Sequence, residues 1–167
     1  GQRARRALSK SDPGLFGQDH SGPMDRSKIF SKNQVSANMK KVLITGGAGF
    51  VGVNLTAYLH QLGGYEVTVL DNETLGDRRH LEPYGARFVA GDLLNERGLK
   101  QALEGQDFVV HLAADTRVMD SIENPAHNFE NNVLGSFKLL QACRELGVNR
   151  VVAASTGGAI LGDVPAP

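Results

Sequence analysis

The 167-residue sequence predicts a three-layered α/β fold in which a doubly wound parallel sheet carries helices on both faces. Three observations predict it. Short apolar runs that suit buried strands alternate with segments whose apolar residues recur at helical spacing. The first strand-like run ends in a glycine-rich turn that opens a helix. The connections are short, which favours parallel strands joined by crossover helices.

The elements follow one another from Lys41. Residues 42–44 form an apolar run, a glycine turn follows, and residues 51–62 carry apolar side chains at helical spacing. The further expected elements are strands at 66–70, 87–90, 108–112 and 151–154 and a short helix at 95–103. Right-handed crossovers between such strands predict a sheet order of third, second, first, fourth, fifth.

A long helix is expected before the last strand, with Gly147 as its C-cap. Its predicted sheet-facing residues are Phe129, Val133, Phe137, Leu140 and Cys143. The sheet is expected to be truncated after about five strands, because the sequence stops at Pro167.

Composition predicts one domain and excludes several classes of protein. Residues 1–38 lack periodicity and are expected to be a disordered tail or a fusion remnant, which leaves residues 39–167 as an incomplete domain without a substrate-binding partner domain. The tail carries seven Lys and Arg against three Asp, and the body eleven against fifteen acids. A negative body argues against nucleic-acid binding. A single cysteine excludes an internal disulfide and favours a cytoplasmic setting, and no run reaches the ~18 apolar residues of a membrane span.

The turn from Thr45 to Gly52 has the glycine spacing of a dinucleotide-binding, Rossmann-type loop through Gly46, Gly49 and Gly52. Such glycines allow a tight turn, a close approach of the backbone to a pyrophosphate, and close packing of helix on sheet. The helix N-terminus supplies N–H groups and partial positive charge, so an anion is bound without a basic patch. The alternative is a glycine turn that serves packing alone.

Asp71 ends the second predicted strand nineteen residues after Gly52, close to the spacing of a carboxylate that binds the adenosine ribose. A carboxylate there repels a 2′-phosphate, so NAD is favoured over NADP. Arg78 and Arg79 could reach such a phosphate but are interpreted as solvated. An exposed turn acid is the alternative for Asp71.

Two further strand ends are candidate ligand positions, because open α/β sheets bind ligands at the carboxyl ends of their strands. The residues are Asp92 and Leu93 after the third strand and Leu112, Ala113 and Ala114 at the fourth. Plain loops are the alternative for both. His111 is interpreted as a structural histidine, and no metal site is expected, because no His or Cys lies at metal-ligand spacing around it.

These motifs together resemble the NAD-dependent epimerase/dehydratase family of extended short-chain dehydrogenases/reductases, typified by UDP-glucose 4-epimerase. The resemblance covers residues 39–163 and includes Asn132 to Ser136 and Ser155 to Ile160. It implies that Gly46, Gly49, Phe50 and Val51 lie along the pyrophosphate, Asp71 and Asn72 bind the ribose region, Asp92 and Leu93 meet the adenine, and Ala113, Ala114 and Ser155 flank the nicotinamide. It also implies that Asn132 contacts the cofactor or orders the site.

In this family a tyrosine, with a lysine four residues later, removes a proton from a sugar hydroxyl while hydride passes to NAD. The tyrosines here are Tyr58, Tyr65 and Tyr84, and none has that lysine. The resemblance therefore implies the NAD-binding part of a nucleotide-sugar epimerase, inactive as this fragment, with Thr156 as a candidate hydroxyl residue. Its implied partners are a UDP- or dTDP-sugar and, in a homodimer, a second copy of the chain. A dehydratase, a reductase and a non-catalytic NAD-binding module are the alternatives.

Overall fold

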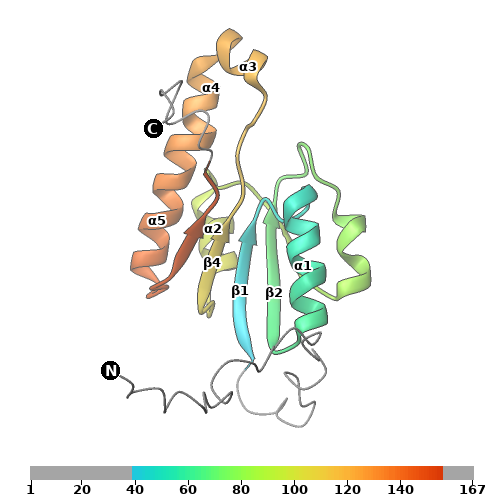
Figure 1. The fold of residues 1–167 in the computed structure, drawn as a ribbon. Coiled ribbons are helices and arrows are strands. Elements are labelled where there is room, and N and C mark those ends of the chain that lie inside the picture. The colour runs from blue at the N-terminus through green and yellow to red at the C-terminus, as the bar shows by residue number, and fades with distance from the viewer. Residues whose placement is uncertain (1–38, 156–167) are drawn as a thin grey trace, which may run out of the picture. The chain divides into compact units, whose positions relative to one another are not determined.

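The computed structural model describes residues 39–155, which form a five-stranded parallel sheet in the order β3-β2-β1-β4-β5. The strands are β1 Lys40–Thr45, β2 Tyr65–Asp71, β3 Arg87–Ala90, β4 Phe108–His111 and β5 Val151–Ala153. All four pairings are parallel, so the carboxyl ends of the strands meet at one edge of the sheet (Figure 1). The predicted fold class and strand order are confirmed.

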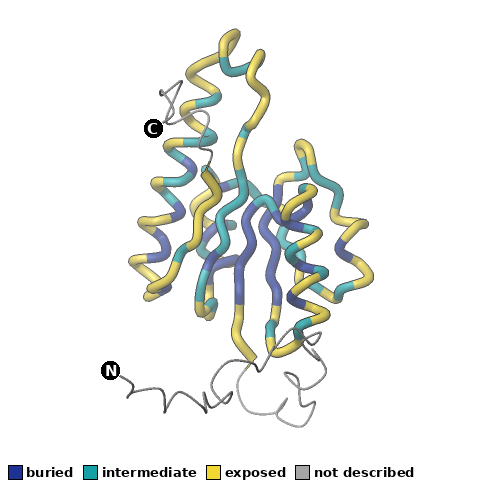
Figure 2. The backbone as a smooth tube through the Cα atoms, in the orientation of Figure 1, coloured by how far each residue is buried: buried dark blue, intermediate teal, exposed yellow. Residues whose placement is uncertain are grey.

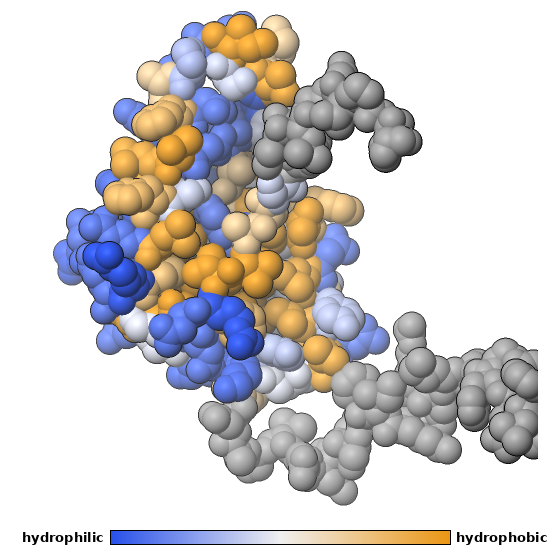
Figure 3. All heavy atoms as spheres, turned by 60° about the vertical axis from the view of Figure 1, so that its left-hand side comes forward, coloured by the Kyte–Doolittle hydropathy of each residue, from blue (hydrophilic) through white to orange (hydrophobic). Residues whose placement is uncertain are grey.

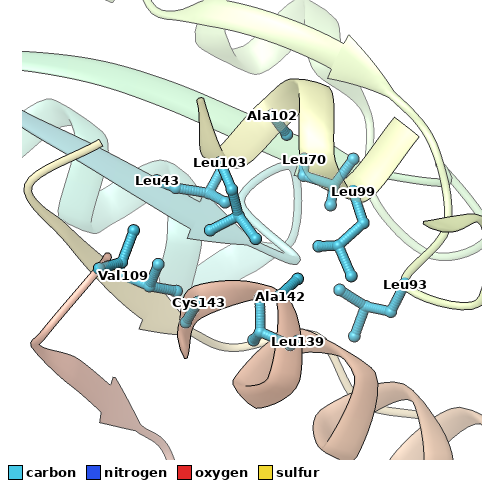
Figure 4. Packing of buried hydrophobic residues seen from close by; sticks show 11 residues of the cluster. Leu43, Leu70, Leu93, Leu99, Ala102, Leu103, Val109, Leu139, Ala142 and Cys143 are labelled. Atoms are coloured by element: carbon cyan, nitrogen blue, oxygen red, sulfur yellow. The ribbon is translucent and has the colours of Figure 1, made fainter. Parts of the chain in front are cut away.

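Helices cover both faces of the sheet. On one face α1, Phe50–Leu62, and the 3-10 segment η3, Arg78–Tyr84, pack on a cluster that includes Val42, Ile44 and Val69. On the other face α2, Glu96–Leu103, and α5, Gly135–Glu145, pack on Leu43, Leu70 and Val109. Burial is concentrated in the central strands (Figure 2), and the second cluster is shown in Figure 4. The segment η3 was not predicted, because its polar sequence carries no clear apolar period.

The predicted long helix has several parts. It comprises α3, Val118–Glu123, α4, Pro125–Phe129, a π-helical segment η4, Glu130–Leu134, and α5. A proline opens α4, and the Asn124 side chain caps it by accepting from His127 N–H. The π-helical turn inserts an extra residue into the helix and so shifts the phase of its side chains.

The predicted sheet-facing side of this helix is wrong except for Cys143. Four of its members are more than half exposed: Phe129, Val133, Phe137 and Leu140. The helix instead packs through Leu139, Ala142 and Cys143, which lie on an adjacent stripe (Figure 4). The segment is apolar over two neighbouring stripes, and the one with the smaller side chains packs on the sheet. Figure 3 shows hydrophobic side chains gathered on the face that carries this helix.

The prediction of a disordered tail or fusion remnant at residues 1–38 falls outside the described residues, as does Thr156. Within residues 39–155, no helix is both long and apolar enough to cross a membrane.

Candidate functional site

A cavity of about 610 Å³ lies at the carboxyl edge of the sheet, a volume in the range of small-molecule and cofactor sites. It is lined by twelve of the residues singled out in the sequence: Gly46, Gly49, Phe50, Val51, Gly52, Asp71, Asn72, Asp92, Leu93, Leu112, Ala113 and Ala114. They come from the start of α1, from the end of β2 and from the segments that follow β1, β2, β3 and β4, which are far apart in the sequence. Asn132 and Ser155 are not among the lining residues.

The glycine turn between β1 and α1 is closely packed against β4 and against the start of α1. Gly46 has φ +68°, and a Cβ there would lie 2.6 Å from the backbone nitrogen of Ala113 at the end of β4. A Cβ on Gly52 would lie 2.4 Å from the Cα of Gly47. Gly46 and Gly52 therefore let the turn lie against β4 and let α1 approach the turn, as the spacing predicted.

Helix α1 begins at this turn and directs its N-terminus toward the cavity. Its N-cap is Gly49, so no N-cap side chain occupies the free N–H groups of the first turn, and no acidic residue lies in that turn. Phe50 and Val51 are exposed and line the cavity. Peptide N–H groups at a helix start attract an anion, so this end of the cavity suits a pyrophosphate.

Asp71 is buried at the end of β2, so the alternative of an exposed turn acid is wrong. Its Oδ2 accepts a hydrogen bond from the Ala48 N–H at 3.0 Å, and its Oδ1 accepts one from the Glu73 N–H at 2.7 Å. The carboxylate thus joins the glycine turn to the loop after β2. Each carboxylate oxygen can accept more than one hydrogen bond, so Asp71 can also accept from ribose hydroxyls.

The two arginines near Asp71 are both engaged by carboxylates. Arg78 pairs with Glu73, with 3.4 Å between Nε and Oε1, and its guanidinium lies over the Phe88 ring at 5.5 Å from the centroid. Arg79 hydrogen-bonds Asp77, which lowers the pKa of that carboxyl to about 2. Neither arginine lines the cavity, and their side chains are 59% and 80% exposed, which agrees with the interpretation that they are solvated.

A second polar link joins the ends of β2 and β3. The Asn72 side-chain amide donates to Asp92 Oδ2 at 2.9 Å, and Asp92 Oδ1 accepts from the Leu94 N–H at 2.9 Å. The Asn72 oxygen accepts from the N–H and the hydroxyl of Thr74. These bonds fix the loops at the end of the cavity where the adenosine is expected.

Asn132 acts on the cavity through the backbone of Asp115. Its Oδ1 accepts from the Asp115 N–H at 2.7 Å, and its Nδ2 donates to the Asp115 carbonyl at 2.9 Å. Asp115 follows Ala114 directly and lines the cavity. Of the two roles that the resemblance implied for Asn132, the structure shows contacts of the ordering kind. The residue lies in the π-helical segment, a feature that is frequent at functional sites.

Several lining residues were missed in the sequence. Asp115, Thr116 and Arg117 continue the segment after Ala114, and His127 and Asn131 come from α4 and the π-helical segment. Hydrogen bonds from Arg117 to Asp115 lower the pKa of the Asp115 carboxyl. The acid and base two residues apart were the available signal, but charged pairs at that spacing are common in solvated loops. Thr74, Leu75 and Gly76, from the loop after β2, also line the cavity and carried no motif.

His111 lies at the end of β4 but is not a lining residue. Its Nδ1 is 2.7 Å from Thr45 Oγ1, and its Nε2 is 2.9 Å from Ser136 Oγ. Burial lowers the pKa of the imidazole. These bonds agree with the interpretation of a structural histidine. Among residues 39–155, no group of three or more His, Cys, Asp or Glu side chains is placed to hold a metal ion.

A parallel sheet in this order, with a glycine turn at a helix start and an acid ending the second strand, defines a Rossmann-type dinucleotide-binding domain. Residues 42–167 match the family model described as NAD dependent epimerase/dehydratase family. The chain belongs to that family.

Similar proteins are named as epimerases. The chain is 36% identical over 124 residues to a putative UDP-glucose 4-epimerase of Methanocaldococcus jannaschii, a match that covers 73% of this chain and 40% of the relative. It is 36% identical over 133 residues to a UDP-glucose 4-epimerase of Klebsiella pneumoniae, covering 75% of this chain and 94% of that sequence. The crystal structure of a Thermus thermophilus UDP-glucose 4-epimerase in complex with NAD superposes with a TM-score of 0.69 and 44% identity.

That structure is matched over 75% of this chain and 40% of its own length. The chain likewise spans about two fifths of the length of the first curated relatives, at 40% and 36%.

Proposed function

We propose that residues 39–155 bind NAD in the cavity at the carboxyl edge of the sheet. The observation that carries the proposal is that Asp71, the glycine turn and the start of α1 all line one cavity, with the Asp71 carboxylate hydrogen-bonded to the turn at Ala48. The helix N-terminus receives the pyrophosphate, and Asp71 receives the ribose hydroxyls. The family description and the NAD complex of the Thermus thermophilus relative support the choice of cofactor.

The charges at the ribose end favour NAD over NADP. Asp71 lines the cavity there, and the nearby Arg78 is paired with Glu73. A 2′-phosphate would meet the Asp71 carboxylate in a buried setting, where repulsion between like charges is costly. We therefore expect NAD to bind at least about tenfold more tightly than NADP, which corresponds to about 1.4 kcal/mol.

The test is a titration of the chain with NAD and with NADP by isothermal calorimetry. Asp71→Ala is expected to weaken NAD binding and to reduce the preference over NADP. Asp107→Ala is the matched control, because Asp107 also accepts a backbone hydrogen bond, from Lys41 N–H at 2.7 Å, but precedes β4 at the other end of the strand. Equal affinities of the unmodified chain for the two cofactors would contradict the assignment of Asp71.

We further propose that this NAD site serves a nucleotide-sugar 4-epimerase, in which hydride passes from sugar to NAD and back. The support is the set of relatives named as UDP-glucose 4-epimerases. The 167 residues contain no Tyr-x-x-x-Lys, the proton acceptor that the family uses, so the chain alone is expected to bind NAD without turnover. Thr156 remains the candidate hydroxyl residue.

An assay of UDP-galactose conversion tests this second proposal. We expect no turnover by the 167-residue chain and turnover by a longer chain that supplies the tyrosine and lysine. Conversion by the short chain would contradict the expected inactivity. A longer chain that binds NAD and eliminates water from a dTDP-sugar would instead favour the dehydratase, and one that leaves every sugar nucleotide unchanged would favour a non-catalytic NAD-binding module. A cytoplasmic setting remains a prediction from the single cysteine.

We also propose that the exposed apolar face of the α4 to α5 helix is the contact between two copies. The face consists of Phe129, Val133, Phe137 and Leu140, each more than half exposed. The four residues recur every three or four positions from α4 through the π-helical segment to α5, and Figure 3 shows hydrophobic side chains gathered on the face that carries this helix. Contiguous apolar surface of this kind is uncommon on monomers, and a stripe that faces its own copy across a two-fold axis buries itself.

The proposed dimer is tested by sedimentation velocity at micromolar concentration. Phe137→Glu is expected to give a monomer. Tyr58→Glu is the control, since Tyr58 is similarly exposed, at 59% against 60%, but lies on α1 at the opposite face of the sheet. A monomeric unmodified chain, or equal effects of the two substitutions, would contradict the dimer.

A further inference from the structure

A chain of hydrogen bonds runs behind the cavity, through side chains that do not line it. At one end the Ala113 N–H donates to Thr45 Oγ1 at 3.4 Å, and Thr45 is fully buried. Thr45 Oγ1 then meets His111 Nδ1 at 2.7 Å. At the other end His111 Nε2 meets Ser136 Oγ at 2.9 Å, and the Ser136 hydroxyl donates to the Asn132 carbonyl. The imidazole thus joins the ends of β1 and β4 to the helix.

The donors and acceptors in this chain define one protonation state of His111. The Ser136 hydroxyl uses its only hydrogen on Asn132, so it must accept a hydrogen bond from His111 Nε2–H. On the other side Thr45 Oγ1 accepts from Ala113 N–H, which leaves its own hydrogen for His111 Nδ1. All the N–H and O–H groups in this hydrogen-bond chain find an acceptor in only one state of the imidazole, the neutral ring with its proton on Nε2.

Protonation of Nδ1 would break this arrangement. The Thr45 hydroxyl hydrogen would lose its acceptor, and Thr45 is fully buried. Each hydrogen-bonded contact that the structure shows for the His111 ring is to a hydroxyl group and not to a carboxylate. Burial of the imidazole also opposes its charged form.

These hydrogen bonds matter to the cavity because they help to hold the segment from Ala113 to Asp115 at both of its ends. Thr45 holds the Ala113 N–H, and Asn132 holds both the N–H and the carbonyl of Asp115. Ala113, Ala114 and Asp115 all line the cavity. His111 is the side chain that connects one support to the other, since it bonds Thr45 directly and, through Ser136, the backbone carbonyl of Asn132, the residue whose side-chain amide holds Asp115.

We propose that His111 is a positioning residue for cofactor binding, which in its neutral Nε2–H form holds the two supports of the Ala113 to Asp115 segment in register. The proposal rests on the proposed NAD site. It predicts that the affinity for NAD depends on a ring that lies outside the cavity. It also predicts that this ring keeps one tautomer at neutral pH.

The tautomer is tested by ¹⁵N-imidazole NMR on histidine-labelled chain. We expect one histidine whose Nδ1 has the shift of an unprotonated acceptor and whose Nε2 carries the proton, and that signal is expected to disappear in His111→Gln. The pattern is expected to persist without cofactor, because every bond in the chain is within the protein. A proton on Nδ1, or a charged ring at a pH of about 7.5, would overturn the proposal.

The effect on binding is tested with variants that are first shown to fold by circular dichroism. His111→Phe keeps a ring but removes both hydrogen bonds, and we expect it to weaken NAD binding about tenfold or more. His111→Gln supplies one acceptor and one donor and is expected to restore part of that loss. If the ring only filled space, His111→Phe would bind NAD at least as tightly as His111→Gln.

A double-substitution cycle separates coupling from general loosening. Ser136→Ala breaks the same hydrogen-bond chain. The double variant is therefore expected to bind NAD about as weakly as His111→Phe alone. Ser121→Ala is the control, because the Ser121 hydroxyl also donates to a carbonyl within a helix but belongs to α3. Additive effects of His111 and Ser136 would overturn the proposal, as would wild-type affinity in His111→Phe. If the unmodified chain fails to bind NAD, the proposed function falls together with this one.

Discussion

The contact between Gly46 and the end of β4 makes a quantitative prediction. An alanine at Gly46 adds two separate costs. Its backbone has φ +68°, a conformation that costs an L-residue about 1–2 kcal/mol. Its Cβ would also lie 2.6 Å from Ala113 N and 2.7 Å from Ala113 Cα, which are backbone atoms that cannot rotate away. Overpacking of this kind costs about 1–3 kcal/mol.

Gly85 supplies the matched control. Its φ is +64°, but a Cβ there meets no atom within 4 Å. Gly85→Ala therefore carries the conformational cost alone, about 1–2 kcal/mol, against about 2–5 kcal/mol for Gly46→Ala. With a urea slope of about 2 kcal/mol/M, the midpoints should fall by about 0.5–1 M and about 1–2.5 M.

The assay is urea unfolding followed by circular dichroism, with NAD titration of the folded variants. We expect Gly46→Ala to lose NAD affinity as well, since the turn must move away from Ala113, whereas Gly85→Ala keeps it. Equal midpoints for the two variants would refute the close contact between the turn and β4. Normal NAD binding by Gly46→Ala would refute its role in shaping the cavity.

Three further predictions concern the core, the thiol and pH. In the monomeric chain Leu139→Ala should cost about 2–5 kcal/mol and Leu140→Ala less than about 0.5 kcal/mol, because Leu139 is fully buried and its neighbour is 54% exposed. The urea midpoints are compared at a concentration where the chain is monomeric, and equal midpoints would contradict the packing of the Leu139 stripe on the sheet. Cys143 is 2% exposed and burial raises its thiol pKa, so it should react with a disulfide reagent only on unfolding, and fast reaction of the folded chain would contradict this. Burial lowers the folded-state pKa of His111 below its usual 6.5, so the unfolded chain takes up that proton first and stability should fall as pH drops below about 6.5. His111→Gln should reduce that loss of stability between about pH 7.5 and 5.5. If the free energy of unfolding depended on pH equally in both proteins, the neutral folded state of His111 would be contradicted.

The centre of the sheet could be predicted from the sequence because most residues of β1 and β2 are buried, on both faces. Such strands are continuous apolar runs, and the glycine turn and Asp71 fix where the first two end. The positions of Asp92 and Ala113 follow from the same rule, since parallel strands place their carboxyl ends at one edge. The rule needs no knowledge of side-chain contacts, which is why these residues were found.

The packing of the long helix could not be predicted in the same way. Its sequence contains both the buried Leu139 stripe and the exposed Phe137 stripe, and helical periodicity supports each equally well. The π-helical segment adds a change of phase that no residue type announces. Which stripe meets the sheet depends on how closely the helix can approach, and the stripe that is buried contains the small Ala142.

The role of Asn132 was likewise open, because an amide on a helix can serve a ligand or the protein. In the structure both of its polar atoms are used by the backbone of Asp115. The same holds for Asp71, whose two oxygens already accept backbone hydrogen bonds. These groups are satisfied before any ligand binds, so the protein itself maintains the shape of the cavity.

Because these polar groups are hydrogen-bonded within the protein, the affinity for a ligand depends on the preformed shape of the cavity as well as on direct contacts. A ligand that enters the cavity does not have to order Asp71 or the Asp115 segment, so it avoids part of the entropic cost of binding. Substitutions behind the cavity, at His111 or Ser136, should then weaken binding by loosening the site, even though they remove no contact to the ligand. Substitution of Asp71 should do both, because the same carboxylate holds the glycine turn through Ala48 and faces the expected position of the ribose.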